Sequence, residues 1–369
     1  MTEQHEPVDP AVASPALGTM AGKGYYNLHS RPQHGAVAFG LPLAETAAEA
    51  VPLPAQGGVL TIADYGVAGG HNSMEPVGAM LSTIRSRPSG EGAVSVVHTD
   101  LPTNDFDPLF TLLASPDSYL AGRSDVFAYV TGGSFYEQLF PAATVDLGWN
   151  AIAVHWLSSV PVAIPDHIWS NCAPPTVRQA FATQSADDWR QFLLHRTAEL
   201  VPGGQLIVLG GASDDDGKSH AEGLMDMANA ELQMLVEKGT LQPAEYERMV
   251  IPTYNRTLAE FRAPFTDGQA PPELQLLSAD EVTLDDPFWA AFAANHDAKA
   301  FADAEVDFFQ AAFGPSLFEA LDQRRPQQEA DSLAAAFYAG LGDRAAADPA
   351  TARCDWRIVN LHLAKHDAA

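Results

Sequence analysis

The chain has 369 residues, of which 46% are hydrophobic and 18% are charged, as in a globular protein with a sizeable core. Lysine and arginine total 20 against 47 acidic residues, which gives a net charge of −27. This charge repels phosphate backbones and anionic lipid, and no apolar run reaches the roughly 20 residues of a membrane helix. We therefore expect neither nucleic acid nor membrane as a partner.

Residues 1–19 are rich in Pro, Glu, Ala and Asp and lack the basic and apolar regions of a signal peptide. We predict a disordered tail there. The two cysteines, Cys172 and Cys354, lie far apart and match neither a disulfide framework nor a metal motif. A reduced, cytoplasmic setting is expected.

Residues 20–33 are aromatic and polar without a regular period, so we predict a loop able to fold over a ligand, followed by a helix over Phe39–Ala50. A β-branched strand over Val59–Ala63 comes next and ends at Asp64.

A glycine turn starting at Gly66 follows that strand and leads into a helix. Its G-x-x-G spacing differs from the G-x-G-x-x-G of dinucleotide sites, and Asp64 just before it suits a ligand with an ammonium group better than a phosphate. S-adenosylmethionine (SAM) meets these demands. An ordinary βα turn explains the loop equally well.

Four further strands are predicted over Ala93–Thr99, Asp125–Thr131, Val145–Ala153 and Gln205–Leu209. Their alternation with helices over 58–210 predicts an α/β fold with a mostly parallel, doubly wound sheet.

Two polar positions in this region are assigned a role. Asp100 is a candidate ligand-binding residue, and Ser185 is a candidate helix cap. Asp100 follows the second strand, where a carboxylate can accept from two ribose hydroxyls, although a turn cap is the alternative. Ser185, with Asp188 three residues later, is the predicted N-cap of an amphipathic helix that ends at Val201–Gly204.

Beyond residue 212 the pattern becomes helical. Helices are predicted after a capping box at Ser219–Glu222, and over Phe288–His296, Ala304–Phe313 and Ala330–Ala339. Strand signals are scarce until Trp356–Leu363, which alternates and can pair back into the sheet. We predict a core formed by 20–212 and 351–369, with a helical cap over 213–350 that forms part of a substrate pocket.

Seven blocks occur in a fixed order: Tyr26 with Ser30 and Gln33, Asp64–Asn72, Asp100–Phe106, Gly133–Tyr136 with Leu139–Pro141, His155–Pro161, Val201–Gly204 and Ile358–Leu363. Together they resemble the SABATH family of SAM-dependent carboxyl methyltransferases. The resemblance implies a Rossmann-like methyltransferase fold with a cap, and SAM as the cofactor.

The resemblance also implies which residues contact SAM. Asp64 and Asn72 suit its methionine end, Asp100 its ribose, and Leu101 with Phe135 its adenine. The full set implied for the cofactor is Tyr26, Ser30, Asp64, Gly66, Asn72, Asp100, Leu101, Ser134 and Phe135.

Gln33 and Trp156 match the family positions that hold the substrate carboxylate through neutral donors. The implied reaction is an SN2 transfer in which a carboxylate oxygen attacks the SAM methyl group. It needs no general base, because a carboxylic acid with a pKa of about 4 to 5 is already ionised at neutral pH. His155 is also assigned to the reaction site. A role as a residue of the pocket wall is favoured over a role as a general base.

The chain departs from the plant pattern at several positions. Met249 and Val250 replace a Phe-Asn pair that is associated with a metal, so no metal site is expected. Ile152 and Gly210 stand where bulkier residues are common, which predicts a longer and less aromatic acyl pocket. Candidate pocket walls, each also explained as plain core, are Ile152, Tyr254, Phe308 and Phe313.

High alanine, aspartate and arginine usage is typical of a GC-rich bacterial genome and favours a member resembling fatty acid O-methyltransferases, acting on a medium-chain fatty acid. The alternatives are an aromatic acid (salicylate, benzoate or indole-3-acetate), a ring nitrogen, or SAM binding without catalysis. Since members of this family are often dimers, a homodimer stays open.

Overall fold

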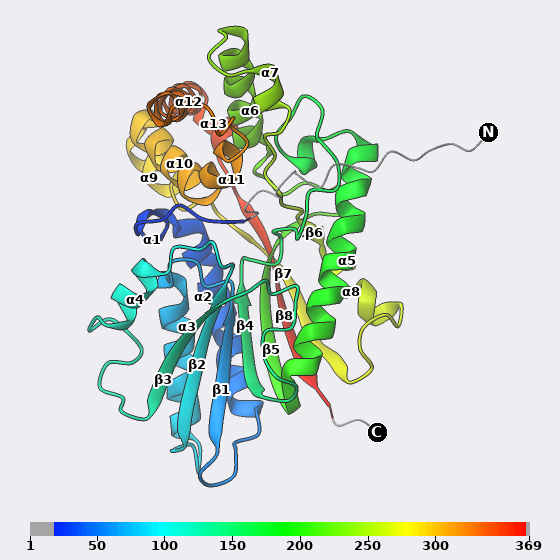
Figure 1. Cartoon of the computed structure of the whole chain (residues 1–369). Helices are drawn as coiled ribbons and strands as arrows, with labels where there is room; N and C mark the ends of the chain where they lie inside the picture. Colours follow the sequence, from blue (N-terminus) through cyan, green and yellow to red (C-terminus); the bar gives the residue numbers. More distant parts are fainter. Residues whose placement is uncertain (1–17, 367–369) are drawn as a thin grey trace, which may run out of the picture.

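The computed structural model describes residues 18–366, so most of the tail predicted for 1–19 lies outside the described residues. At its centre is a sheet in the order β3-β2-β1-β4-β5-β8-β7, with β6 paired to β5 (Figure 1). β1 to β5 are parallel, and β8 runs antiparallel to both β5 and β7. The α/β class predicted from the sequence is confirmed.

The strands are β1 (Val59–Tyr65), β2 (Ala93–Asp100), β3 (Val126–Gly132), β4 (Val145–Ala151), β5 (Leu200–Ser213), β6 (Arg256–Thr257), β7 (Leu274–Leu284) and β8 (Trp356–Lys365). The helices of the core are α1 (Tyr25–His29), α2 (Arg31–Ala50), α3 (His71–Ser86), α4 (Asp107–Leu113), α5 (Pro175–Glu199) and α8 (Leu258–Thr266), with a 3₁₀ turn at Ser170–Cys172. The remaining helices are α6 (Glu222–Glu237), α7 (Pro243–Tyr246), α9 (Trp289–Asn295), α10 (Ala298–Ala312), α11 (Gly314–Phe318), α12 (Gln327–Ala347) and α13 (Pro349–Ala352).

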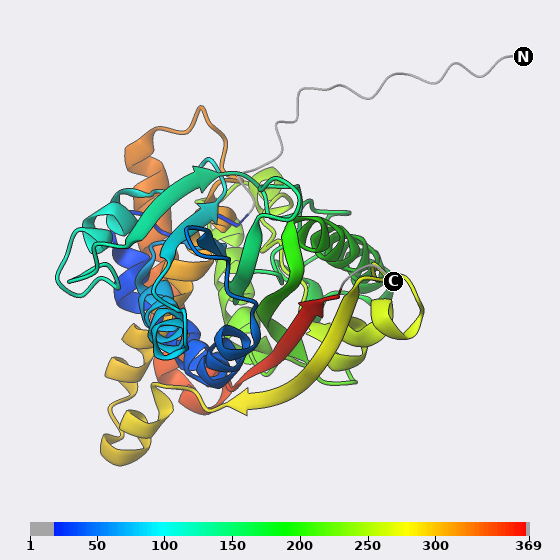
Figure 2. The same ribbon diagram turned by 90° about the horizontal axis from the view of Figure 1, so that it is seen from below.

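Helices cover both faces of the sheet, as the view along it shows (Figure 2). α2 and α3 bury apolar side chains against Leu60 and Ile62 of β1, and α5 and α8 pack on the opposite face, which presents Ala63 and Tyr65. This alternation is the two-residue period of a strand. α2 lies directly on the sheet because Gly40 has no side chain, since a Cβ there would stand 2.7 Å from Leu209.

A second core lies above the carboxyl ends of the parallel strands and is built mainly from α6, α10 and α12 (Figure 1). It packs aromatic side chains such as Phe309 and Phe337 between these helices. No helix within residues 18–366 is long and apolar enough to cross a membrane.

The region 213–350 is not wholly helical, which corrects the predicted cap. It contains β7, whose eleven residues pair with β8 in the main sheet. β7 lies at the edge of the sheet and mostly alternates between exposed and partly buried residues, so its apolar signal is weak. A stretch from the middle of this region therefore belongs to the core.

Helix boundaries also differ from the predicted ones. α1 and α2 begin at Tyr25 and Arg31, inside the stretch predicted as a loop. For α2 the reason is that Pro32 occupies the first turn of a helix at no cost in hydrogen bonds. Ser185 is not an N-cap, since α5 begins ten residues earlier. Asp188 instead accepts hydrogen bonds from the backbone N–H and the hydroxyl of Ser158 at 2.9 and 2.6 Å.

A buried acid pair joins the cap to the start of β8. Glu305 and Asp286 are 1% and 2% exposed. Asp286 accepts from the backbone N–H groups of Phe288 and Cys354. Burial, and then Asp286, raise the pKa of Glu305 well above its usual value. Glu305 therefore enters the folded state with its proton.

Glu305→Gln is expected to raise the Tm at pH 8 by about 2 °C or more and to leave it nearly unchanged at pH 4. Because the pKa of Glu305 is raised in the folded state, its contribution to the free energy of unfolding is fully present at low pH and is lost as pH rises through the folded-state pKa. The amide of the variant donates a hydrogen bond at every pH. Thermal melts from pH 4 to 9 measure this. Glu231→Gln is the control and should lower the Tm at neutral pH, because Glu231 is a buried carboxylate paired with Arg344 at 2.9 Å. A pH dependence unchanged by Glu305→Gln would refute the assignment.

Candidate cofactor and substrate site

The turn after β1 is held tightly against β2. Gly66 has φ +85°, and a Cβ there would stand 2.7 Å from the Cβ of Ala153, so only glycine fits. The N–H groups of Gly66 and Val67 donate to the carbonyl of Thr99 at 2.8 and 3.0 Å. Ala68 follows with φ +48°, an uncommon conformation for alanine. The turn is therefore fixed in place before any ligand binds.

Asp100, at the end of β2, accepts hydrogen bonds from the backbone N–H groups of Ala68 and Leu101 at 2.6 and 2.7 Å. The pKa of Asp100 is raised to about 6, chiefly by burial and also by the nearby Asp64, while the two N–H groups oppose the shift. The carboxylate is thus ionised at neutral pH and titrates just below it.

A cavity of about 550 Å³, here called the large cavity, opens at the carboxyl ends of β1, β2 and β4. Six residues predicted to contact SAM line it: Tyr26, Gly66, Asp100, Leu101, Ser134 and Phe135. Phe135 stands edge-on to Tyr136 at 4.7 Å, which holds its ring in the wall. Asp188 and Gln191 of α5 line the same cavity and were not predicted.

Asp64 and Asn72 border a narrow space beside the turn, here called the small cavity, together with Gly66 and Gln33. Ser30 lines none of these cavities. Its hydroxyl lies 3.3 Å from the side-chain nitrogen of Asn72, from which it accepts a hydrogen bond. Ser30 therefore acts through Asn72.

Behind Asp64 lies a series of hydrogen bonds that the sequence analysis did not predict. His98 Nδ1 is 2.7 Å from Asp64 Oδ2, and His98 Nε2 is 2.8 Å from the Tyr119 hydroxyl. All three residues are at most 3% exposed. A carboxylate only accepts, so Nδ1 carries the proton and Nε2 accepts from Tyr119. The small cavity lies beside Asp64, on the side away from His98 in this hydrogen-bonded series.

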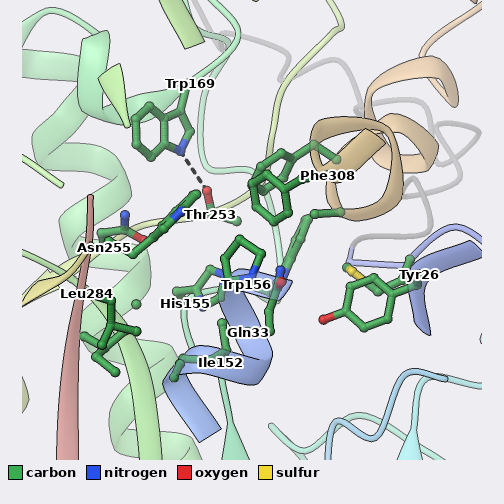
Figure 3. Close-up of a pocket in the computed structure, with 18 residues that line it drawn as sticks. Tyr26, Gln33, Ile152, His155, Trp156, Trp169, Thr253, Asn255, Leu284 and Phe308 are labelled. Atoms are coloured by element: carbon green, nitrogen blue, oxygen red, sulfur yellow. Dashed lines mark hydrogen bonds between the residues drawn. The ribbon is translucent and has the colours of Figure 1, made fainter. Parts of the chain in front are cut away.

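A third space, the apolar cavity, lies between the cap and the ends of β5 and β8 (Figure 3). The cavity is lined by six of the residues assigned from the sequence to the substrate site, namely Gln33, Ile152, His155, Trp156, Phe308 and Phe313. Its free volume is only about 40 Å³. Six aromatic side chains line it, which is contrary to the less aromatic pocket that we expected: Tyr26, Trp156, Trp169, Phe308, Phe313 and Trp356.

Tyr254 does not line the apolar cavity. Its hydroxyl donates to Glu260 at 2.8 Å, and its ring packs in a separate cluster with Phe181. The residues on either side, Thr253 and Asn255, line the cavity instead. Side chains alternate along an extended segment, so the prediction was displaced by one residue. Gly210 is covered by Phe261, and the neighbouring Gly211 lines the cavity.

Gln33 and Trp156 bring neutral polar groups to the apolar cavity. No described residue accepts a hydrogen bond from the Trp156 indole N–H, and the buried Oε1 of Gln33 has no partner among residues 18–366. Trp156 itself is fixed, because its carbonyl accepts from the Tyr136 hydroxyl at 2.6 Å and Gly18 packs on its ring. The Trp156 indole N–H and the side-chain NH₂ of Gln33, neither of which donates to a described residue, are therefore two donors available at this site, whereas Gln33 Oε1 can only accept.

His155 is neutral in this setting. Burial lowers its pKa to about 3, and the nearby Arg256 contributes. Arg256 is 1% exposed, donates to the carbonyls of Val154 and Ser185, and forms no ion pair with any described residue. A histidine with so low a pKa is a weak general base at neutral pH.

The three cavities meet at Tyr26 and Ile152, which line all of them. Ile152 has φ +51°, which is a strained conformation for a β-branched residue. Its N–H donates to the Leu209 carbonyl at 2.7 Å and holds the turn at the end of β4. A ligand in the large cavity therefore comes next to one in the apolar cavity.

One group of possible metal ligands lies away from these cavities. His167, Cys172 and Asp226 bring their ligand atoms within 4.8 Å of one another. His167 Nδ1 accepts from the Trp169 backbone N–H at 3.0 Å, so Nε2 carries the proton and donates to Asp226 at 3.1 Å. These hydrogen bonds account for the grouping, whose Asp226 is exposed, and we propose no metal there.

A sheet whose first five strands are parallel and whose β8 is antiparallel, with a glycine turn after β1, an acidic residue at the end of β2 and a cavity at the strand ends, defines a Rossmann-like methyltransferase fold. Loganic acid methyltransferase with SAH shares this fold, with a TM-score of 0.73, 18% identity and coverage of 95% of this chain and 99% of that chain. The family model for SAM dependent carboxyl methyltransferases matches residues 17–270. The chain belongs to this family, the SABATH methyltransferases, whose cofactor is SAM.

Two curated relatives are similar over much of their length. Methyltransferase LUC1 of Fusarium sp is 33% identical over 249 residues, covering 65% of this chain and 64% of that protein. O-methyltransferase acrG of Aspergillus aculeatus is 31% identical over 277 residues, covering 71% of each. The matches thus span about two thirds of the length of these relatives.

The hydrogen bonds that link Asp64, His98 and Tyr119 lead to a prediction about SAM binding. His98→Leu is expected to weaken SAM binding about tenfold, because a buried carboxylate loses a charge-assisted donor. Tyr119→Phe should cost less, since it removes only the outer hydrogen bond. Calorimetry with SAM and with 5′-methylthioadenosine, which lacks the amino-acid end, measures the effect. Methylthioadenosine should bind both variants as it binds the wild type, and an equal loss for the two ligands would show general damage instead.

Proposed function

We propose that this chain transfers the methyl group of SAM to the carboxylate of a small hydrophobic acid and releases the methyl ester. The observation that carries the proposal is the pair of unpartnered neutral groups on Gln33 and Trp156, in a cavity that meets the large one at Tyr26 and Ile152. Neutral donors orient a carboxylate without pairing its charge, so the oxygen stays nucleophilic.

SAM supplies an electrophilic methyl group on a sulfonium. The carboxylate oxygen forms the new bond as the methyl–sulfur bond breaks, and the electron pair goes to sulfur. No proton moves, because the acid is already ionised at neutral pH. This agrees with His155, whose lowered pKa leaves it neutral. In this proposal the protein acts by holding the two reactants in line at roughly 3 to 3.5 Å.

The acid must approach a chain with a net charge of −27. Long-range repulsion opposes this approach and is screened at physiological salt. Close to the apolar cavity the buried Arg256, beside His155, is a positive charge without an ion pair among the described residues. Arg256 offsets part of the repulsion near the cavity, but it is too enclosed to form an ion pair with the substrate carboxylate.

For the particular acid we propose a medium-chain fatty acid, as the composition favours. An aromatic acid is the second candidate, and the six aromatic side chains around the apolar cavity support it. Its small free volume requires the walls to move apart for either acid. The proposed cap, built on α10 and α12, carries Phe308 and Phe313, so we infer that the cap provides this movement.

An assay of methyl ester formation with octanoate, decanoate, salicylate, benzoate and indole-3-acetate tests the function. We expect turnover with at least one acid. Turnover of ring acids alone would refute the fatty-acid assignment. SAM binding by calorimetry with no ester from any acid would favour a non-catalytic binding protein, and methylation of a purine nitrogen would favour the N-methyltransferase alternative.

A further inference from the structure

Thr253 and Asn255 lie on an extended segment that runs beside the loop after β4. Thr253 forms an antiparallel bridge with Trp156, and the Tyr254 N–H donates to the His155 carbonyl at 2.9 Å. Alternation turns Thr253 and Asn255 towards the apolar cavity and Tyr254 away from it. Figure 3 shows Asn255 on the side of the cavity opposite Tyr26.

These side chains have hydrogen-bonding capacity that the protein does not use. Asn255 is 5% exposed, and its side-chain amide makes no hydrogen bond to any described residue. The Thr253 hydroxyl accepts from the Trp169 indole N–H at 2.8 Å, which leaves its own proton to donate elsewhere. His155 Nδ1 is buried and unpartnered within residues 18–366. Three polar groups thus border the cavity in addition to those of Gln33 and Trp156.

Gly211 shows that two of these groups converge. A Cβ at Gly211 would lie 3.3 Å from Asn255 Oδ1 and 3.3 Å from His155 Nδ1. The absent side chain leaves the cavity open beside both atoms. Any larger residue would fill it and cover them.

Buried polar groups are normally paired, because desolvation without a hydrogen bond is costly. An unsubstituted alkyl chain in the apolar cavity would exclude water from Asn255 and would form no hydrogen bond with its amide. A substrate oxygen would satisfy the amide, the Thr253 hydroxyl, or both.

We propose that the preferred acid carries a second oxygen substituent, a hydroxyl or carbonyl group, and that Asn255 recognises it with Thr253 and His155. This inference rests on the proposed function and narrows its substrate class from hydrophobic acids to hydroxy or oxo acids. Asn255 is thereby a specificity-determining residue, and it takes no part in the methyl transfer.

The test compares matched acids on the wild type: octanoate with its positional hydroxy and oxo derivatives, and benzoate with its hydroxy derivatives. We expect at least one oxygenated acid to exceed its parent about tenfold or more in kcat/KM, since a pocket built to bond an oxygen discriminates against its absence. Calorimetry in the presence of S-adenosylhomocysteine should give the same order of affinities without any chemistry.

Asn255→Leu, similar in size, should reduce the preference for the oxygenated acid to near onefold while the parent acid loses less than about threefold. Leu284→Met, which changes the same cavity without a polar group, should retain the preference. Thr253→Ser, which keeps the hydroxyl, should retain it as well. Melting curves confirm that each variant is folded.

Two outcomes would overturn the inference. One is equal or better turnover of the parent acids across the series. The other is a preference that survives Asn255→Leu, which would mean that water satisfies the amide in every complex. Failure of the proposed function looks different, because then no acid of either kind is methylated although SAM binds.

Discussion

Asp100→Asn is expected to weaken SAM binding about 100-fold. The proposed ribose contact places two hydroxyl donors on this carboxylate, and hydrogen bonds to a charged group contribute about 1.5–3 kcal/mol each. Asparagine keeps only one acceptor oxygen. Its NH₂ group would also face the N–H of Ala68 or Leu101, which both donate to Asp100. Titration calorimetry with SAM measures the loss directly.

The same carboxylate predicts a pH effect. Burial raises the pKa of Asp100 to about 6 in the free protein, so acidification from pH 7 to 5 protonates it. The ionised form accepts from the ribose, and wild-type affinity should therefore fall towards tenfold per pH unit below about 6. Asp100→Asn should remove this step. Asp107→Asn, an exposed acid on the same segment, is the matched control and should bind SAM as the wild type does. An unchanged pH profile in Asp100→Asn would exclude Asp100 as the titrating group.

Trp156→Phe is expected to lower kcat/KM for the acid about 10- to 100-fold and to change the Kd for SAM less than about threefold. The indole N–H is proposed as a neutral donor to the substrate carboxylate, and a hydrogen bond to a charged group has this magnitude. Phenylalanine keeps an aromatic ring against Phe313, with which Trp156 packs at 6.1 Å. Steady-state kinetics and calorimetry separate the two effects.

The control for Trp156 is Trp289→Phe, an identical change outside the cavities, where Arg353 lies over the ring at 4.9 Å. It should leave both constants near wild type. If Trp156→Phe lost SAM affinity and activity to the same degree, the indole would support the large cavity rather than hold the acid. Gln33→Leu, tested in the same way, should reproduce the kinetic loss.

Much of the site could be predicted because local sequence carries it. Gly66 and Asp64 lie in a strand-turn-helix unit whose backbone geometry depends on neighbours in the chain. Asp100 lies at the end of a segment whose apolar pattern predicts a β-strand. Parallel strands end at the same edge of a sheet, so these residues had to approach one another.

Other features depend on contacts between distant segments. His98 faces Asp64 because β1 and β2 pair in a register that sets these two residues side by side, and Tyr119 reaches them from a loop. β7 joins the sheet through β8, which follows it by some seventy residues. Neither arrangement leaves a periodic signal in the chain, since both depend on partners that tertiary structure supplies.

The sequence alone was sufficient for the family, the order of the strands along the chain and the cofactor, since these rest on short motifs and local periodicity. Tertiary structure decided which side of an extended segment faces the apolar cavity. Tyr254 turns to Glu260, while Thr253 and Asn255 enter the apolar cavity. A strand shows which residues alternate, but the partner it packs against decides which set is inside.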